Sequence, residues 1–336
     1  VLPKVTPAMN EYLDKPFTAL EVKTALFQMA PSKAPGVDGF TAGFFQRHWD
    51  LLQEDIVLAV LDFLNGGELP VGMNDTSITL IPKVRYPQRI SQYRPISLCR
   101  VLYKIASKCI ANRTRPFLGE IVSEEQSAFV PGRLITDNVL IAYESVHAMR
   151  RRKKGRNHVC AVKLDMMKAY DRVEWHYLEA IMLRLGFSTS FVRLTMKCVT
   201  SVRFTVRVNG ELLPYFTPSR GLHQGDPYSP YLFLLCAEGF TSLLNNLGGA
   251  QVDRGIRVSN HSPWVNHLLF ADDSLIFMKA KEASAHRLNQ VLRIYGECSG
   301  QCVNKEKKFY LLLSQHTRSS QTKAEVSSRN HGGSLQ

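Results

Sequence analysis

Residues 267–277 read HLLFADDSLIF and place two adjacent acids, Asp272 and Asp273, at the centre of an apolar run. Both arms of this stretch are rich in strand-forming residues, which predicts two short buried strands joined by a tight turn. Because Asp is a common turn residue, the stretch taken alone favours an ordinary turn. Two carboxylates at the tip of a buried hairpin are costly, however, unless a cation or hydrogen-bond donors offset their charge. A metal site would require a further carboxylate from elsewhere in the chain.

The overall composition favours a polyanionic partner. The chain has 336 residues, is 45% hydrophobic and carries a formal net charge of +13. This length allows a sizeable core, and the basic excess favours nucleic acid before a membrane surface as the partner. The chain holds no apolar run of the roughly 18 residues that span a bilayer. It opens at Val1 without a signal peptide, so we expect a fragment of a longer polypeptide.

The seven cysteines are odd in number, scattered, and mostly in apolar surroundings. This usage predicts a reduced, intracellular protein rather than a disulfide framework. Cys298 and Cys302 form a CxxxC pair without a nearby Cys/His pair, which does not favour a zinc site.

Helical and strand patterns alternate irregularly, which predicts an α+β fold. A strand at 77–83 and an extended piece at 93–98 would form a hairpin-like flap around the basic loop 83–89. A strand at 204–211 ends at an Asn-Gly turn, a strong hairpin signal. Apolar periodicity also predicts helices. Their ranges are residues 43–64, 101–118, 136–149, 174–185, 191–199, 231–247 and 282–295.

Residues 150–156 read RRRKKGR, with six cations in seven positions. This run predicts a solvated surface loop, and the basic composition of the chain also allows contact with a phosphate backbone. The candidate nucleic-acid contacts are Arg133, Arg151, Arg152, Lys153 and Lys154.

A third acid, Asp165, directly follows the predicted buried strand 159–164. If Asp165 meets Asp272 and Asp273 in the fold, their carboxylates form a hard oxygen site that suits Mg²⁺. Such a site is suited to in-line phosphoryl transfer with two metal ions. Lys83 and Arg94 on the flap are candidates for holding a triphosphate, and Gly225 would allow close approach of the backbone to a nucleotide.

Five blocks in this order resemble the reverse transcriptase domain of non-LTR (LINE-type) retrotransposons, especially plant forms. They are YRPISL at 93–98, QSAFVPGRLITDN at 126–138, VKLDMMKAYDRVEW at 162–175, GLHQGDPYSPYLF at 221–233 and LLFADDSLIF at 268–277. KAPGVDGF at 33–40 and SGQCVNKEK at 299–307 resemble the flanking blocks, so the resemblance covers about residues 5–310.

The resemblance implies a right-hand polymerase fold with fingers and palm, and this chain is expected to depart from the family in lacking the thumb. Residues 1–72 would form an extension upstream of the fingers, residues 73–310 the fingers and palm, and residues 311–336 a degenerate or disordered tail. The implied activity is RNA-directed DNA polymerase, with dNTP substrates, an RNA template and a DNA primer or target. Two Mg²⁺ ions, or alternatively Mn²⁺, would be the cofactors. The chain would act in the nucleus, with a cytoplasmic ribonucleoprotein stage.

The resemblance also assigns roles to single residues. Asp165 and Asp272 would bind the metals and Asp273 would support them. Tyr170 would lie under the incoming sugar, although an ordinary core aromatic is the alternative at this position. The remaining matches are Gln224 and Gly225 at the incoming nucleotide, Lys83 and Arg94 at the triphosphate, and Lys307 as a proton donor to pyrophosphate or a plain surface lysine.

The chain departs from the family pattern at several positions. His223 replaces an Arg, which would remove a fixed cation unless the imidazole is protonated, and Tyr228 replaces a Leu. The strand expected after Lys308 degrades into the tail. A catalytically inactive nucleic-acid-binding remnant is therefore the second hypothesis. An RNA-dependent RNA polymerase is the third, and bulky Tyr170 at the sugar position disfavours it.

Overall fold

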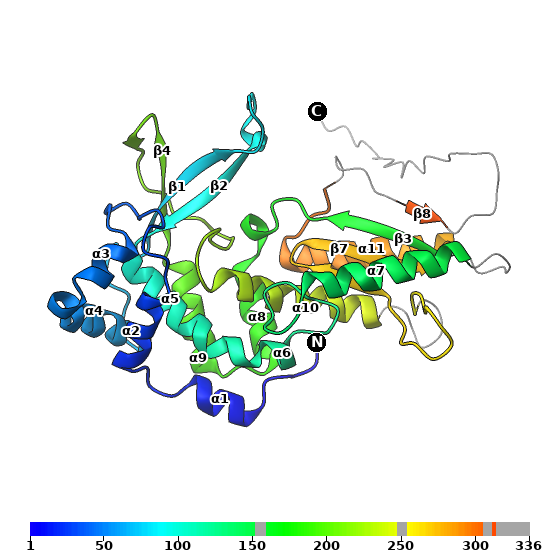
Figure 1. Ribbon diagram of the computed structural model, residues 1–336, viewed down its shortest axis with the longest axis horizontal. Coiled ribbons are helices and arrows are strands. Elements are labelled where there is room, and N and C mark those ends of the chain that lie inside the picture. The colour runs from blue at the N-terminus through cyan, green and yellow to red at the C-terminus, as the bar shows by residue number, and fades with distance from the viewer. Residues whose placement is uncertain (152–158, 247–253, 305–310, 314–336) are drawn as a thin grey trace, which may run out of the picture.

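The computed structural model describes residues 1–151, 159–246, 254–304 and 311–313, which fold into two four-stranded sheets with helices around them (Figure 1). The first sheet has the order β2-β1-β4-β5 and the second the order β6-β7-β3-β8. The strands of the first sheet are β1 (Asp75–Pro82), β2 (Tyr93–Cys99), β4 (Arg203–Val208) and β5 (Glu211–Leu212). Those of the second are β3 (Val159–Asp165), β6 (His267–Phe270), β7 (Asp273–Lys279) and β8 (Leu311–Leu313).

The predicted flap is confirmed. β1 and β2 pair antiparallel, with Pro82 opposite Tyr93, and the pair projects away from the helices in Figure 1. β4 pairs in parallel with the first residues of β1 and anchors the flap. Asn209 and Gly210, which join β4 to β5, have φ values of 50° and 91°. Positive φ at both central residues is the geometry of the tight hairpin turn that Asn-Gly favours.

Helices form most of the N-terminal half, and two predicted helices are divided. Residues 43–64 form α3 (Ala42–Arg47) and α4 (Trp49–Leu64), because the backbone of His48 (φ −104°, ψ 24°) leaves the helical region. The helix predicted for 101–118 ends as α5 (Val101–Thr114) and continues through a 3₁₀ turn, η2 (Arg115–Phe117), into α6 (Leu118–Ile121). Pro116 lacks the N–H that a continuous helix needs at this point.

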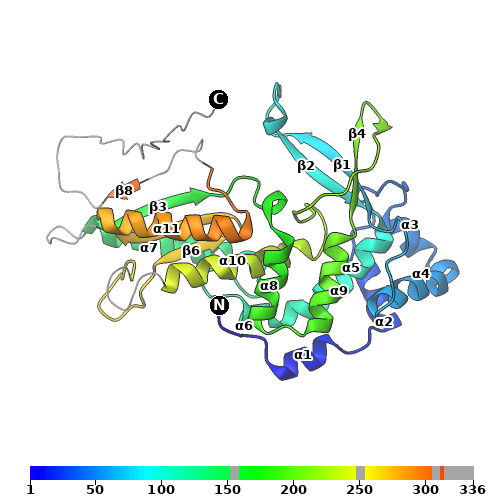
Figure 2. The ribbon, with the colours of Figure 1, turned by 180° about the vertical axis from the view of Figure 1, so that it is seen from behind.

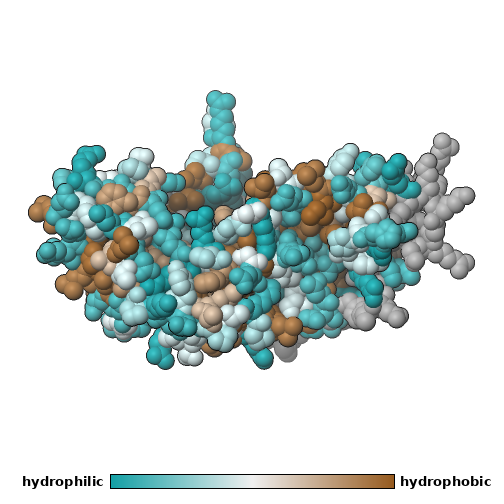
Figure 3. All heavy atoms as spheres, turned by 60° about the horizontal axis from the view of Figure 1, so that its bottom comes forward, coloured by the Kyte–Doolittle hydropathy of each residue, from teal (hydrophilic) through white to brown (hydrophobic). Residues whose placement is uncertain are grey.

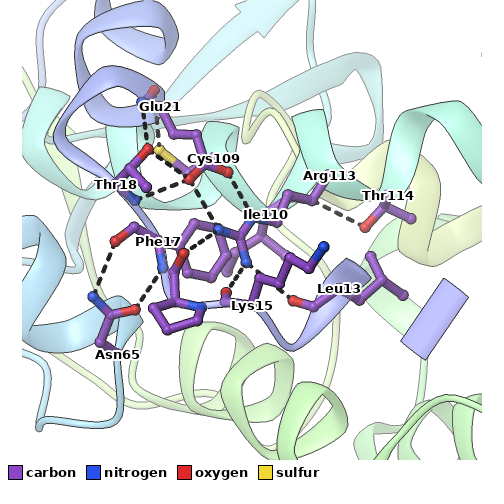
Figure 4. A network of polar contacts seen from close by, with 11 residues as sticks. Leu13, Lys15, Phe17, Thr18, Glu21, Asn65, Cys109, Ile110, Arg113 and Thr114 are labelled. Carbon is purple, nitrogen blue, oxygen red and sulfur yellow. Dashed lines mark hydrogen bonds and ion pairs between the residues drawn. The ribbon is translucent and has the colours of Figure 1, made fainter. Parts of the chain in front are cut away.

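The residues predicted as an N-terminal extension share one core with α5. The helices α1 (Pro7–Leu13) and α2 (Ala19–Phe27) pack beside it, and buried Val22, Val60 and Ile105 belong to the same apolar cluster. Figure 4 shows how the guanidinium of buried Arg113 in α5 holds the segment between α1 and α2. Arg113 donates to Glu21 Oε1 (2.6 Å) and to backbone oxygens of that segment, and its guanidinium lies 3.5 Å from the centre of the Phe17 ring.

The second sheet is covered on both faces, and its strands therefore alternate between two apolar clusters. α7 (Ile135–Arg151) lies in front of the sheet in Figure 1, where Met149 packs with Ala161 and Phe277. The opposite face is seen from behind in Figure 2, where α11 (Glu282–Ser299) crosses it. That face presents Cys160 and Ile276 to the main core, with α8 (Trp175–Leu185), α9 (Thr189–Thr200) and α10 (Ser229–Asn246).

β8 extends this sheet into the segment that was predicted as a tail. Leu311–Leu313 pairs antiparallel with residues 160–162 of β3, and residues 314–336 lie outside the described residues. Exposed hydrophobic residues lie in several separate groups among hydrophilic ones on the face in Figure 3. None of the described helices is long and apolar enough to cross a membrane.

Candidate active site

The three acids predicted from the sequence meet at one end of the second sheet. β3 and β7 pair antiparallel, and the last residue of β3, Asp165, lies directly opposite the first residue of β7, Asp273. Directly opposed residues in such a pair have Cα atoms only about 5 Å apart. Asp272 occupies the two-residue turn between β6 and β7, immediately before Asp273. The register of the sheet, rather than proximity in sequence, therefore joins these carboxylates.

Neighbouring side chains hold two of the acids. Lys163 Nζ lies 3.0 Å from Asp273 Oδ1, and both side chains are about half exposed. The backbone N–H of Asn304 donates to Asp165 O (2.8 Å), and Asn304 Nδ2 lies 3.3 Å from Asp165 Oδ2. Asn304 was missed in the sequence because nothing local to it indicates an acidic partner in β3.

The carboxylate oxygens at this site fit a divalent cation that takes its remaining ligands from water and substrate. Within the described ranges, no three Asp, Glu, His or Cys side chains are close enough to enclose an ion by themselves. Mg²⁺ typically takes one or two carboxylates and completes its octahedron with water and substrate phosphates. Asp165 and Asp272 suit that role, whereas the carboxylate of Asp273 is turned to Lys163.

Tyr170 lies beside the acids. It opens η3 (Tyr170–Arg172), and its ring stacks on Phe233 of α10 with centroids 4.9 Å apart and planes 11° apart. Burial raises the pKa of the Tyr170 hydroxyl, and the negative charge of Asp272 raises it further. The phenol therefore stays neutral, and its ring, stacked on Phe233, lies next to Asp272.

The Gln224-Gly225 loop links η3 to the flap. The backbone N–H of Ser97 in β2 donates to Gln224 O (2.9 Å), and Gln224 Nε2 donates to Asp171 Oδ1 (3.1 Å). Gly225 has φ +119°, and a Cβ atom there would lie 3.0 Å from Ser97 O, so glycine suits both the conformation and the space.

Asp171 was also missed in the sequence, and it lies where the flap meets this loop. Burial raises the pKa of its carboxyl, while Lys168, the hydrogen bond from Gln224 and Lys83 act in the opposite direction. The influence of Lys83 places this flap cation near the loop. Lys83 Nζ also donates to Ser91 O (3.2 Å) across the base of the flap tip.

His223 does not replace the family's arginine as a fixed cation. The ring is buried, which lowers the pKa of His223, and the opposing charge of Asp226 does not restore it. The imidazole borders a cavity of about 10 Å³ together with Tyr103 and Ser107. Tyr228 is likewise buried, with its hydroxyl 3.4 Å from Thr114 Oγ1.

The other candidate cations divide into three groups. Arg94 is exposed on β2, opposite Ile81, and Arg151 is exposed at the end of α7. Arg133 instead donates to four backbone oxygens, those of Gly119, Val122, Ser123 and Gln126, at 2.6–3.0 Å. Four further candidates lie outside the described residues: Arg152, Lys153, Lys154 and Lys307.

Residues 81–326 match the family model described as reverse transcriptase (RNA-dependent DNA polymerase). The chain belongs to the reverse transcriptase family. The segment contains the flap from Ile81 onward, Asp165, the Gln224-Gly225 loop and the Asp272-Asp273 turn, and the resemblance drawn from the motifs is confirmed. Reverse transcriptases use divalent metal ions, in agreement with the oxygen donors at this site.

Curated relatives include transposon proteins much longer than this chain. A 149 kDa transposon TX1 protein of Xenopus laevis is 35% identical over 243 residues, which is 72% of this chain and 18% of that protein. The Pol polyprotein of retrotransposable element R2 from Popillia japonica is 28% identical, over 78% of this chain and 35% of its own length. A mitochondrial protein of Arabidopsis thaliana is 55% identical over 67 residues, which is 20% of this chain and 55% of that protein.

Among solved structures, telomerase from Candida tropicalis bound to a telomeric RNA fragment aligns with a TM-score of 0.51 and 12% identity. The alignment covers 82% of this chain and 45% of the telomerase. At this identity the likeness shows the fold alone. It confirms the predicted right-hand polymerase architecture. The sheet that carries Asp165 and Asp273 is called the palm sheet below.

Proposed function

We propose that this chain is the RNA-directed DNA polymerase of a LINE-type retroelement, which adds dNTPs to a DNA 3′-hydroxyl along an RNA template. The observation that carries the proposal is the convergence of Asp165 with the Asp272-Asp273 turn at one end of the palm sheet. Membership of the reverse transcriptase family and relatives from the R2 and TX1 elements support it.

Asp165 and Asp272 would hold the divalent cations, Mg²⁺ first and Mn²⁺ as the alternative, with Asp273 in support. A pair of such ions activates the attacking hydroxyl and stabilises the charge of the leaving pyrophosphate. The chain would supply the surrounding contacts. Tyr170 would exclude a 2′-hydroxyl, and Gln224 and Gly225 would contact the incoming nucleotide.

The cations around the site would bind phosphates. Lys83 and Arg94 on the flap would hold the triphosphate, and Lys307 would donate a proton to pyrophosphate. The basic run that begins at Arg150, with Arg151, Arg152, Lys153 and Lys154, would contact the nucleic-acid backbone. Such contacts make binding weaken as salt concentration rises. We place this activity in the nucleus, where a retroelement finds its DNA target.

Arg133 is proposed as a nucleic-acid contact only through its remaining exposed edge. Its terminal nitrogens already donate to backbone oxygens between α6 and α7. Its substitution should therefore disturb that loop more than it weakens RNA binding.

Primer extension on poly(rA)/oligo(dT) with Mg²⁺ tests the polymerase function of the full chain. We expect incorporation of dTTP by the wild type and a loss of at least about a thousandfold in Asp272→Asn, since metal coordination is worth several kcal/mol in the transition state. Asp50→Asn, which changes an exposed acid in the first turn of α4, is the matched control. An inactive wild type that still binds RNA in a salt-dependent way would favour the non-catalytic remnant.

A further inference from the structure

The loop between α6 and α7 reaches the strand that leads into the catalytic turn. Gln126 forms a parallel bridge with Leu269 of β6. The N–H of Leu269 donates to Glu125 O (2.8 Å), and the N–H of Ser127 donates to Leu269 O (3.2 Å). Asn138 Nδ2, at the start of α7, also donates to Leu269 O (2.8 Å). The loop therefore acts as a short extra strand at the edge of the palm sheet.

The side-chain amide of Gln126 contacts both the backbone N–H and the backbone C=O of one turn residue, Ala271. Gln126 Oε1 accepts the N–H of Ala271 (3.0 Å), and Gln126 Nε2 lies 3.4 Å from Ala271 O. The same Oε1 accepts the N–H of Ala128 (3.0 Å), which fixes the amide itself. Only 1% of Gln126 is exposed, so water does not compete for these bonds.

Ala271 is the turn residue that needs such support. Its φ is +52°, in the left-handed region that costs a residue with a Cβ atom more than it costs glycine. Ala271 directly precedes Asp272, so its backbone conformation sets the direction in which the Asp272 side chain leaves the turn. A different conformation at Ala271 would therefore change the position of the Asp272 carboxylate relative to Asp165.

Arg133 fixes the loop from the other side. Its Nη1 donates to Gln126 O (2.7 Å) and to Ser123 O (2.6 Å). A chain of contacts thus runs from Arg133 through Gln126 to Ala271, the neighbour of Asp272. The polar groups in this series of contacts are paired with one another, and together they stabilise the conformation of the turn.

We propose that Gln126 is a positioning residue of the polymerase site, which acts through Ala271 to hold Asp272 where it can bind a divalent cation. The proposal rests on the proposed function for its effect on DNA synthesis. Its effect on cation binding can be measured without any synthesis.

The test compares three variants of the full chain with the wild type. Gln126→Met keeps the side-chain length and removes both polar groups. Ala271→Gly removes the cost of the left-handed conformation, and the double variant combines the two changes. Gln46→Met is the matched control, because Gln46 Nε2 donates to two backbone oxygens, those of Leu26 and Met29, far from the palm sheet in sequence and fold.

Mn²⁺ titration followed by electron paramagnetic resonance gives the binding constant, with Asp272→Asn defining the specific signal. We expect Gln126→Met to weaken Mn²⁺ binding about tenfold, the equivalent of the loss of one or two hydrogen bonds. Ala271→Gly in the Gln126→Met background should recover most of that loss, because glycine adopts the left-handed conformation without the support of Gln126. Gln46→Met should bind Mn²⁺ as the wild type does.

Primer extension separates this proposal from the proposed function. Gln126→Met should raise the Mg²⁺ concentration required for half-maximal rate more than it lowers the maximal rate. If the wild type binds Mn²⁺ through Asp272 but extends no primer, the proposed function fails and the titration still decides the role of Gln126. Unchanged Mn²⁺ affinity in Gln126→Met, no recovery in the double variant, or no Asp272-dependent binding in the wild type would each overturn the positioning role.

Discussion

Asp165 and Asp273 lie directly opposite each other at the end of the β3–β7 pair, so two carboxylates share one end of the palm sheet. Like charges in this position repel and destabilise the strand pair. Lys163, two residues before Asp165, offsets part of that repulsion through its contact with Asp273. A bound cation would offset more of it, and the metal-free chain is therefore expected to be less stable than the metal-bound chain.

Asp165→Asn should separate stability from function at this pair. Without metal, loss of one charge should increase the free energy of unfolding by about 0.5 kcal/mol, the usual size of a cross-strand charge term. The variant should also lose the rise in melting temperature that Mg²⁺ gives the wild type. Thermal unfolding in EDTA and in Mg²⁺ measures both effects. A variant that is less stable in EDTA and keeps the Mg²⁺ effect would contradict this view of the pair.

Tyr170→Val should relax discrimination between dNTPs and rNTPs. The ring of Tyr170, held against Phe233, would no longer block a 2′-hydroxyl, and we expect rNTP use to rise by about tenfold or more, as for removal of a steric barrier worth about 1–3 kcal/mol. Tyr170→Phe keeps the ring and should keep the discrimination. Single-nucleotide incorporation with dTTP and UTP measures the ratio. Equal preference for rNTPs in the wild type would instead support an RNA polymerase.

Gly225→Ala and Gly210→Ala form a matched pair. Both glycines have left-handed φ values, +119° and +91°, but only at Gly225 would an added Cβ atom meet a close neighbour, Ser97 O at 3.0 Å. Gly210→Ala should cost about 1 kcal/mol of stability from backbone strain alone. Gly225→Ala should cost more and should also raise the KM for dNTP, because it displaces the loop next to Gln224. Urea unfolding and steady-state kinetics provide the comparison, and an unchanged KM would argue against nucleotide contact at this loop.

Arg113→Met should detach the N-terminal segment from α5. Burial raises the pKa of the Glu21 carboxyl, but the hydrogen bonds from Arg113 and Thr18 and the charge of Arg113 together lower that pKa overall. Loss of the guanidinium should cost about 3 kcal/mol, because it leaves backbone oxygens without their donor and Glu21 without its cationic partner. Glu21→Gln should cost less, since Glu21 is partly exposed. Urea unfolding measures both, and equal stability of Arg113→Met and the wild type would refute this role.

The stability of the palm should fall as the pH is lowered from 6.5 to 4. Burial lowers the pKa of His267 from 6.5 to about 4, against the opposing charge of Glu238. Over this range the unfolded chain binds a proton that folded His267 does not, so acid favours unfolding, by at most about 3 kcal/mol at pH 4. His267→Gln should flatten this dependence, whereas His286→Gln, at an exposed position, should not. Equal slopes for His267→Gln and the wild type would exclude His267 as the source.

Local sequence patterns determined the elements and the chemistry of the site. The apolar arms around Asp272 and Asp273 specified a hairpin, and the Asn209-Gly210 pair specified the tight turn between β4 and β5, because both signals lie within a few residues. The order of the motifs indicated the polymerase family and with it the pairing of Asp165 with the turn. The break at His48 was not predicted, since apolar periodicity continues through it.

Tertiary structure alone decided the partners of the polar side chains. In the sequence Arg133 is a candidate phosphate contact, but in the fold it donates to backbone oxygens. His223 stands where the family has an arginine, but its imidazole is buried and neutral. The hydrogen bond between Gln126 and Ala271 joins residues that are 145 positions apart in the sequence. A buried hydrogen bond depends on the position of its partner in space and on the exclusion of water, and neither quantity is encoded in the spacing of residues along the chain.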